Sequence, residues 1–295
     1  MRAPLPVWRS ILYVPVNVDR FVEKAHLRGA DALLLDLEDS IAVTDKESAR
    51  QLLPRAIEKV TRGRADIGVR INRPLDLAVR DIEAAVRPGV SFLSLPKVEG
   101  AGHVRLLSEL VADLEHKRGL REGAIRFIAL VETAASFSKL GEIAGADPRV
   151  VGLALGSEDF ALSCGMQPSG EALTLPKQMA VIAARAAGIL PLGIIGSIAD
   201  FAGMDSFRAV VRRSSAFGLT GSFAIHPDQV PVLNEEFAPS PEAIVEAKAL
   251  LAAAKLAMGD GLGAFAFKGR MIDKPIVQRA ATLLVRAAAV AARTE

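Results

Sequence analysis

The sequence predicts an α/β protein, a single (β/α)8 TIM barrel followed by a helical C-terminal extension. Short apolar runs alternate with segments of helical period, which is typical of a parallel sheet covered by helices. Eight such runs precede residue 228, and eight is the number of strands in a closed barrel of this kind. Polar residues gather at the carboxyl ends of many of these runs, where barrel enzymes hold their active sites.

The eight expected strands follow one another along the first 227 residues. They are Ser10–Val16, Ala30–Glu38, Asp66–Asn72, Ser91–Lys97, Arg126–Glu132, Val150–Gly156, Gly188–Gly196 and Ser222–Pro227. The first intervening helix is expected to begin at Asp19, a good N-cap residue, and to end at Gly29. A doubly wound open sheet is the structural alternative. It is less consistent with the sequence, because no GxGxxG motif follows the first run.

The pattern changes after Pro227. A helix is expected from near Ser240, with Pro241 in its first turn, and a Gly-rich segment and an Ala- and Arg-rich helix follow it. We therefore expect a catalytic barrel at residues 1–235 and an extension at residues 236–295. The extension is too short for an independent domain, and we expect it to pack on its own barrel or on a neighbouring subunit. The GDGLG segment lacks the Lys-Ser/Thr pair of a phosphate-binding loop and is interpreted as a turn.

Composition and charge narrow the function classes. The chain has 295 residues, 51% of them hydrophobic, which suffices for one large core. The net charge of +2 and the lack of like-charge blocks give no sign of nucleic acid or of a membrane surface, and we expect neither as a partner. Charges, Gly or Pro interrupt every apolar run before the ~18–20 residues of a membrane-spanning helix. One cysteine and no clear signal peptide indicate a cytoplasmic enzyme.

Charged and polar side chains follow most of the expected strands. They are Asp36, Glu38 and Asp39 after the second strand, Arg70 and Asn72 after the third, Lys97 after the fourth, Glu132 after the fifth, Glu158 and Asp159 after the sixth, and His226 after the eighth. Carboxylates that converge in a small space repel one another, and a divalent cation relieves this repulsion. Oxygen ligands without a Cys or His cluster favour Mg²⁺, or Mn²⁺, over zinc. An arginine such as Arg70 can hold a substrate carboxylate bidentately.

Each of these residues also has a structural interpretation. A single acidic residue at a strand end is more often a helix N-cap or a surface charge, and only the joint occurrence favours a site. Lys97 is equally compatible with a simple ion pair to a neighbouring carboxylate. His226 is equally compatible with a hydrogen-bonded core histidine. Cys164 is expected to be structural.

Several segments resemble the citrate lyase β-subunit-like branch of the HpcH/HpaI aldolase family. They are RSILYVP, GADALLLDLEDSIAVTDKESAR, VRIN, LPKVE, ALVETAAS, GSEDFAL, AIHPDQV and GRMIDKP, in the family's order and across most of the chain. The resemblance implies a (β/α)8 barrel in which Glu132 and Asp159 hold Mg²⁺ together with waters and substrate oxygens. It also implies that Arg70 grips the carboxylate of an oxo- or hydroxy-acid, with Glu38 and Asp39 close to the waters of the metal.

The same resemblance implies a lyase that cleaves or forms a 3-hydroxyacyl-CoA such as malyl-, citramalyl- or citryl-CoA. Its candidate catalytic residues are Arg70, Glu38, Asp39 and Lys97, and its candidate substrate-binding residues are Arg70, Arg9, Lys24 and His226. The implied partners are a small oxo- or hydroxy-acid and a CoA thioester. The implied assembly is a homo-oligomer, a trimer or a hexamer, in which the C-terminal segment reaches the neighbouring active site.

The chain departs from the family pattern at four places. Lys268 stands where relatives carry an aspartate, Val16 where they carry glycine, and Ser222 where they carry lysine; the seventh strand lacks the aspartate expected near Gly193–Gly196. The metal-binding half of the expected site is intact, whereas the half that faces the acyl carrier is altered. Two alternatives therefore stay open: a metal-dependent aldolase or hydrolase of free hydroxy- or oxo-acids, and a catalytically silent oxo-acid-binding protein.

Overall fold

The computed structural model of the protein describes residues 4–198, 203–259 and 264–294. The chain divides into two compact units, Met1–Phe237 and Ala238–Glu295. This division falls close to the boundary at residues 235 and 236 that the sequence suggested.

The first unit is built on a parallel eight-stranded sheet, in the order β7-β6-β5-β4-β3-β2-β1-β8. The strands are β1 Ser10–Pro15, β2 Ala32–Asp36, β3 Asp66–Arg70, β4 Phe92–Leu95, β5 Arg126–Val131, β6 Val150–Leu155, β7 Leu190–Leu192 and β8 Ser222–Ala224. A parallel bridge between Leu192 and Gly221, with the Gly193 N–H donating to the Gly221 carbonyl at 2.8 Å, brings β7 next to β8. All eight strands lie within the predicted runs, so the predicted TIM-barrel-like fold is confirmed.

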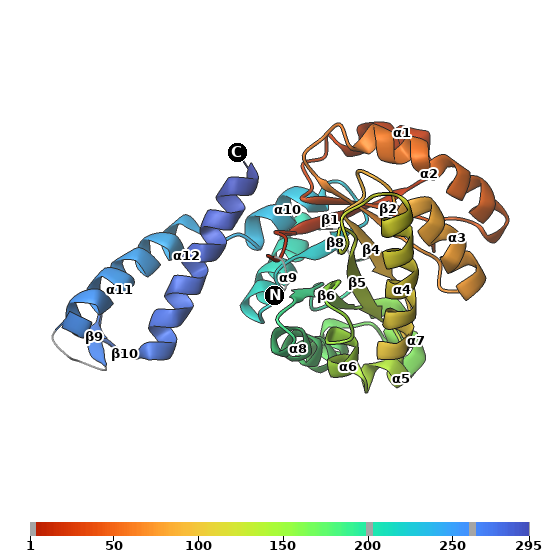
Figure 1. The fold of residues 1–295 in the computed structure, drawn as a ribbon. Helices are drawn as coiled ribbons and strands as arrows, with labels where there is room; N and C mark the ends of the chain where they lie inside the picture. Colours follow the sequence, from red (N-terminus) through yellow and green to blue (C-terminus); the bar gives the residue numbers. More distant parts are fainter. Residues whose placement is uncertain (1–3, 199–202, 260–263, 295) are drawn as a thin grey trace. The chain divides into compact units, whose positions relative to one another are not determined.

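Helices follow the strands and surround them (Figure 1). They are α1 Asp19–Ala25, α2 Lys46–Val60, α3 Leu75–Ala85, α4 Ala101–Lys117, α5 Ala134–Phe137, α6 Leu140–Ala144, α7 Ser157–Cys164, α8 Gly170–Ala186, α9 Met204–Ala216 and α10 Gln229–Glu236, with a 3-10 turn at Val43–Asp45. The predicted start of α1 was one residue off: Val18 is the N-cap and Asp19 is the first helical residue. The negative charge of Asp19 still stabilises the amino end of this helix.

Alternate residues of the strands face opposite ways and form two cores. Leu33 and Leu35 of β2 belong to the large core between strands and helices, whereas Ala32 and Leu34 belong to a second core made almost entirely of strand residues, the barrel interior. Gly68 of β3 makes room there, because a Cβ at this position would lie 2.2 Å from the ring of Phe92. Side chains thus fill the amino-terminal part of the barrel and leave space at its carboxyl end.

The second unit is a helical hairpin whose two helices are joined through a small β-hairpin (Figure 1). Its helices are α11 Pro241–Gly259 and α12 Lys274–Thr294, and its strands β9 Phe265–Phe267 and β10 Arg270–Ile272 pair antiparallel. The predicted helix start is confirmed, since the Ser240 hydroxyl accepts a hydrogen bond from the Ala243 N–H at 3.1 Å. Lys268 (φ 49°) and Gly269 (φ 74°) form a left-handed two-residue turn. Of the predicted GDGLG turn, residues 260–263 lie outside the described residues.

One finding differs from the sequence analysis. By length and composition alone, the Lys274–Arg293 part of α12 could cross a membrane. The sequence had instead predicted that every apolar run is too short for a membrane span. Its alanines raise the hydropathy despite Arg279 and Arg286. Ala280 packs with Ala247 and Leu250 of α11 in the small core of the second unit, and a single such helix is weak evidence for a membrane span.

Candidate active site

A cavity of about 740 Å³ opens at the carboxyl ends of the barrel strands. The side chains that line it come from several strands and from the loops that follow them, and they include Tyr13, Asp36, Asp39, Arg70, Glu132 and Asp159. Polar residues that the sequence places after separate strands therefore meet in one space. Such a place is where barrel proteins carry out chemistry.

Arg70 is surrounded by carboxylates. Its Nε and Nη2 bond the two carboxylate oxygens of Asp36, each at 2.7 Å, in a bidentate pair. Its Nη1 lies 2.8 Å from Glu38 and 2.9 Å from Asp39, and its guanidinium stacks on the ring of Tyr13 at 4.6 Å. Asp36 thus occupies the Nε–Nη2 edge of the guanidinium, and the bidentate grip of Arg70 on a substrate carboxylate stays a prediction. A ligand can approach Nη1 by displacing Asp39, whose side chain is 57% exposed.

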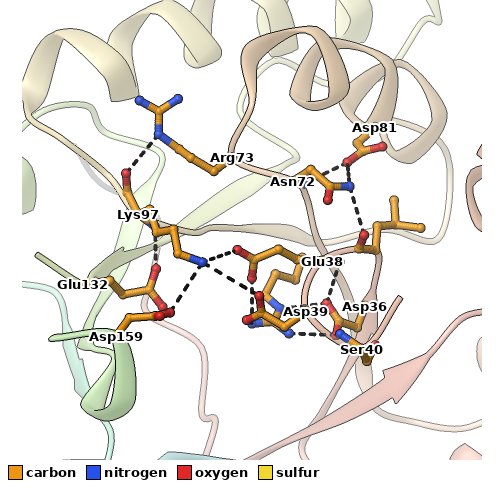
Figure 2. Close-up of polar contacts among 12 residues, drawn as sticks. Asp36, Glu38, Asp39, Ser40, Asn72, Arg73, Asp81, Lys97, Glu132 and Asp159 are labelled. Carbon is orange, nitrogen blue, oxygen red and sulfur yellow. Dashed lines mark hydrogen bonds and ion pairs between the residues drawn. The ribbon is translucent and has the colours of Figure 1, made fainter. Parts of the chain in front are cut away.

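Lys97 connects two groups of carboxylates (Figure 2). Its Nζ lies 2.9 Å from Glu38, 3.4 Å from Asp159 and 3.8 Å from Asp39. Its backbone N–H donates to the Glu132 carboxylate at 2.6 Å. The backbone of Lys97 is left-handed, with a φ of 48°, a strained conformation that persists only where surrounding contacts impose it.

Burial changes the acid–base properties of this cluster. Burial raises the pKa of Glu38 to about 7, although Arg70 and Lys97 favour its charged form. Burial also raises the pKa of Glu132, with a further increase from the nearby Asp159 and an opposing effect from the Lys97 N–H. For Lys97, burial lowers the pKa, but the hydrogen bond to Glu38 and the charges of the nearby carboxylates together outweigh it, so the pKa is raised. Ionising every carboxylate here is costly, so an additional cation would be stabilised.

Glu132 and Asp159 fit a magnesium ion as two oxygen ligands. Glu132 is 5% exposed and is held against the end of β6, where a Cβ on Gly156 would lie 2.6 Å from its carboxylate. Asp159 lies in the first turn of α7, with its side chain 38% exposed. Within the described residues, no group of three or more His, Cys, Asp or Glu side chains could hold a metal. Mg²⁺ needs few protein ligands, because it usually keeps several waters and bonds substrate oxygens.

Of the other predicted site residues, His226 reaches the cavity, whereas Arg9 and Lys24 do not line it. Arg9 precedes β1 and therefore lies at the amino end of the barrel, where it is 6% exposed and bonds Asp31 at 2.8 and 2.9 Å. Arg9 does not line the cavity, so the structure lends no support to its predicted role in substrate binding. Lys24 is exposed on α1 and does not line the cavity, whereas Arg28 does. His226 lines the cavity, with Nδ1 3.4 Å from the carboxylate of Asp228.

Asn72 follows β3 but has a structural partner. Its Nδ2 donates to Asp81 at 2.7 Å and to the Leu37 carbonyl at 2.9 Å, on the side of Figure 2 away from Asp159. The buried Asp81 carboxylate also accepts from Arg50 of α2, so this network joins α2, α3 and the end of β3. It holds the loop after β3 in place and does not face the cavity.

Lys177 of α8, which was not among the predicted site residues, lines the cavity and is 3% exposed. A signal for it exists in the sequence. Lys177 occupies a position in the buried stripe of α8, between Leu173 and Ala180, where helical spacing predicts an apolar side chain. Of the departures from the family pattern, Val16 is 2% exposed, and the Ser222 hydroxyl is buried and has no hydrogen-bond partner among the described residues.

Comparison with known proteins is consistent with this geometry. Residues 9–227 match the profile of the HpcH/HpaI aldolase/citrate lyase family. The L-malyl-CoA/β-methylmalyl-CoA lyase of Cereibacter sphaeroides is 35% identical over 96% of both chains. The citrate lyase subunit β of Leuconostoc mesenteroides subsp. cremoris is 33% identical over 92% of this chain and 90% of that protein.

A similar fold occurs in a solved structure. Protein CitE from Mycobacterium tuberculosis, in complex with magnesium, acetoacetate and coenzyme A, superimposes with a TM-score of 0.74. The two chains share 31% sequence identity, and the match covers 98% of this chain and 100% of the other.

Proposed function

Because the chain belongs to the HpcH/HpaI aldolase/citrate lyase family, we propose that it is a Mg²⁺-dependent carbon–carbon lyase for 3-hydroxyacyl-CoA substrates. It would cleave a malyl-, citramalyl- or citryl-type thioester into an oxo-acid and an acyl thioester, or form the thioester from these two. The observation that carries this proposal is that Glu132, Asp159 and Arg70 line one cavity at the carboxyl end of the barrel, with Lys97 in contact with both Glu132 and Asp159.

Glu132 and Asp159 are the proposed metal ligands. A bound Mg²⁺ would act as a Lewis acid that makes the substrate hydroxyl more acidic and neutralises the oxygens of the oxo-acid. The chain's own contribution is to hold the ligands in place. The Lys97 N–H fixes the Glu132 carboxylate, and the Lys97 Nζ lies 3.4 Å from Asp159.

Glu38, Asp39, Lys97 and Arg70 are the proposed catalytic residues. Glu38 has a pKa of about 7, which suits proton exchange at neutral pH, and its Oε1 lies 2.9 Å from the Lys97 Nζ. Asp39 and the Arg70 Nη1 face the cavity, where Arg70 can orient a substrate carboxylate and neutralise its charge. His226 lines the same cavity and is a proposed substrate-binding residue. Lys24 on α1 is proposed for the same role, although its side chain is not among those that line the cavity.

The barrel, residues 1–235, is the proposed catalytic domain of a homo-oligomer, a trimer or a hexamer. Residues 236–295 are proposed to cover the active site of a neighbouring subunit. We place the enzyme in the cytoplasm.

Two departures favour a second candidate function, an aldolase or hydrolase of free hydroxy- or oxo-acids. Val16 puts a buried side chain after β1, and Lys268 puts a cation at the turn between β9 and β10. By the family resemblance, both positions belong to the half of the site that faces the acyl carrier, and neither belongs to the metal-binding half. A catalytically silent oxo-acid-binding protein would bind the acid without turnover.

The test is to incubate the protein with malyl-CoA, citramalyl-CoA and citryl-CoA, in Mg²⁺ or in EDTA, and to quantify the glyoxylate, pyruvate or oxaloacetate released. Metal-dependent release from one substrate is expected. Glu132→Gln is expected to lower turnover at least ~100-fold and to weaken Mg²⁺ binding, whereas Glu122→Gln on the exposed surface changes neither. Equal Mg²⁺ binding by wild type and Glu132→Gln would contradict the metal assignment.

A further inference from the structure

Lys177 is a buried lysine that reaches the active-site cavity from α8. Its side chain lines the cavity together with Glu132 and Asp159, and the residue is 3% exposed. Its Nζ donates a hydrogen bond to the Leu155 carbonyl at the end of β6. Lys177 therefore places an ammonium group on the wall of the cavity that also holds the proposed metal ligands.

Within the part of the chain that the structure describes, this ammonium group has donors without a partner. An ammonium carries three N–H donors, and the Leu155 carbonyl accepts one of them. Among the described residues, Lys177 forms no ion pair with a carboxylate, which is unusual for a charge so deeply buried. Burial lowers its pKa to about 8, with Glu132 partly opposing the decrease. A negative group from a ligand would remove this cost.

The space beside the amine is open because residue 193 is glycine. A Cβ at Gly193 would lie 3.5 Å from the Lys177 Nζ, so a side chain at this position would project next to the amine. Gly193 has a φ of 125°, a conformation that disfavours other residues, and it lines the same cavity. The loop after β7 thus leaves room for ligand atoms next to Nζ.

Arg70 cannot bind two substrate carboxylates at once. Asp36 occupies its bidentate edge, and Glu38 and Asp39 share its Nη1. Arg70 can therefore accommodate one substrate carboxylate after displacement of Asp39. A substrate with two carboxylates on the same half needs another cation in the cavity, and the Lys177 Nζ is buried and has donors to spare.

We propose that the Lys177 Nζ and the open space beside Gly193 form a subsite for a second carboxylate on the oxo-acid half of the substrate. The inference rests on the proposed function and makes it more specific. The subsite favours an oxo-dicarboxylate, and the 3-hydroxyacyl thioester that contains it, over an oxo-monocarboxylate. No bond is made or broken at Lys177, which acts as a specificity-determining residue.

The experiment compares oxaloacetate with pyruvate, which differ by one carboxylate. Dissociation constants for both are measured calorimetrically with the Mg²⁺-loaded full-length protein. Wild type is expected to bind oxaloacetate more tightly. Lys177→Gln can still donate to the Leu155 carbonyl but lacks the charge, and it is expected to reduce the preference for oxaloacetate at least ~10-fold while pyruvate binding stays within ~2-fold. Lys177→Arg is expected to keep a preference.

A matched control and a folding check make the outcomes distinct. Lys139 also donates to one backbone carbonyl, that of Glu99, but is exposed, so Lys139→Gln should leave the preference unchanged. Thermal melting shows whether each variant is folded. Equal weakening of oxaloacetate and pyruvate binding by Lys177→Gln, or an unchanged ratio of the two dissociation constants, would overturn the inference. Failure of the folded wild type to bind either acid in Mg²⁺ would instead overturn the proposed function.

Discussion

Lys97 combines a left-handed backbone with ion pairs to Glu38 and Asp159. Such strain persists where neighbouring groups impose it, and here the Glu132 carboxylate holds the backbone N–H. Because the ammonium balances carboxylates, Lys97→Met should destabilise the protein by ~1 kcal/mol in EDTA, or ~2–4 °C in melting temperature. Added Mg²⁺ should reduce this loss, since the metal supplies positive charge to the same cluster.

The measurement is thermal unfolding of wild type and Lys97→Met, each in EDTA and in excess Mg²⁺. Lys139→Met serves as the control, because it removes an exposed lysine outside the cluster. A loss of stability that is the same with and without Mg²⁺ would show that Lys97 and the metal do not act on the same carboxylates.

Lys177 predicts a pH dependence of stability. In the folded protein burial lowers its pKa to about 8, whereas in the unfolded chain it stays near the ordinary value of 10.5. Between these values the unfolded state binds more protons, so the free energy of unfolding rises with pH through this group. We expect the wild-type value to increase relative to that of Lys177→Met by about 1–3 kcal/mol between pH 7 and pH 10.

Urea unfolding of both proteins at several pH values measures this difference. Groups that both proteins share cancel in the comparison. A difference that is constant from pH 7 to pH 10 would mean that Lys177 remains protonated in the folded protein throughout.

At the level of single residues, the sequence predicted where a side chain lies better than it predicted which other side chain it bonds. Strand-end reasoning placed Asp39, Arg70, Glu132 and Asp159 at one cavity, because the carboxyl ends of parallel strands meet there. It could not show that the Asp36 carboxylate pairs with the Arg70 guanidinium. That ion pair depends on the register of β2 and β3, which puts the two residues side by side. The same reasoning should have excluded Arg9, which precedes its strand. Lys177 comes from a helix, so strand ends carry no signal for it.

At the level of elements, Gly68 of β3 and Phe92 of β4 determine how the barrel interior packs. A Cβ at Gly68 would lie 2.2 Å from a ring that is fully buried and cannot move aside. Gly68→Ala should therefore lower the free energy of unfolding by about 1–3 kcal/mol through overpacking. The additional change Phe92→Leu should recover part of that loss.

Urea unfolding of the single and double variants tests this prediction. Gly102→Ala on α4 is the control, because a Cβ there meets no atom within 4 Å and alanine favours helix by ~0.5–1 kcal/mol. Equal effects of Gly68→Ala and Gly102→Ala would show that the interior adapts around the added methyl group.

The strands themselves were predictable because buried parallel strands leave continuous apolar runs in the sequence. Their ends were less predictable. The run Gly188–Gly196 contains the strand Leu190–Leu192 only, since Gly193 and Gly196 take positive φ values that end the extended conformation. An apolar run records burial, whereas strand ends depend on backbone angles that the apolar pattern does not encode.

At the level of the whole molecule, the eight-fold alternation of strands and helices predicted the barrel, and the loss of that alternation after Pro227 predicted a C-terminal extension outside the barrel. The sequence could not predict how the subunits associate, because association depends on the surfaces of folded units. The cavity residues all belong to the first unit, which has its own core. The second unit has a separate small core.

A chain that ends at Phe237 should therefore fold and bind Mg²⁺ as the full chain does. Because we propose that residues 236–295 cover a neighbouring subunit's site, this truncated chain should lose most of its turnover. Refolding it together with full-length Glu132→Gln should restore part of the activity, since one chain supplies an intact metal site and the other an intact extension. Full activity of the truncated chain alone, or no recovery in mixed oligomers verified by mass, would show that each subunit's site is complete without its neighbour.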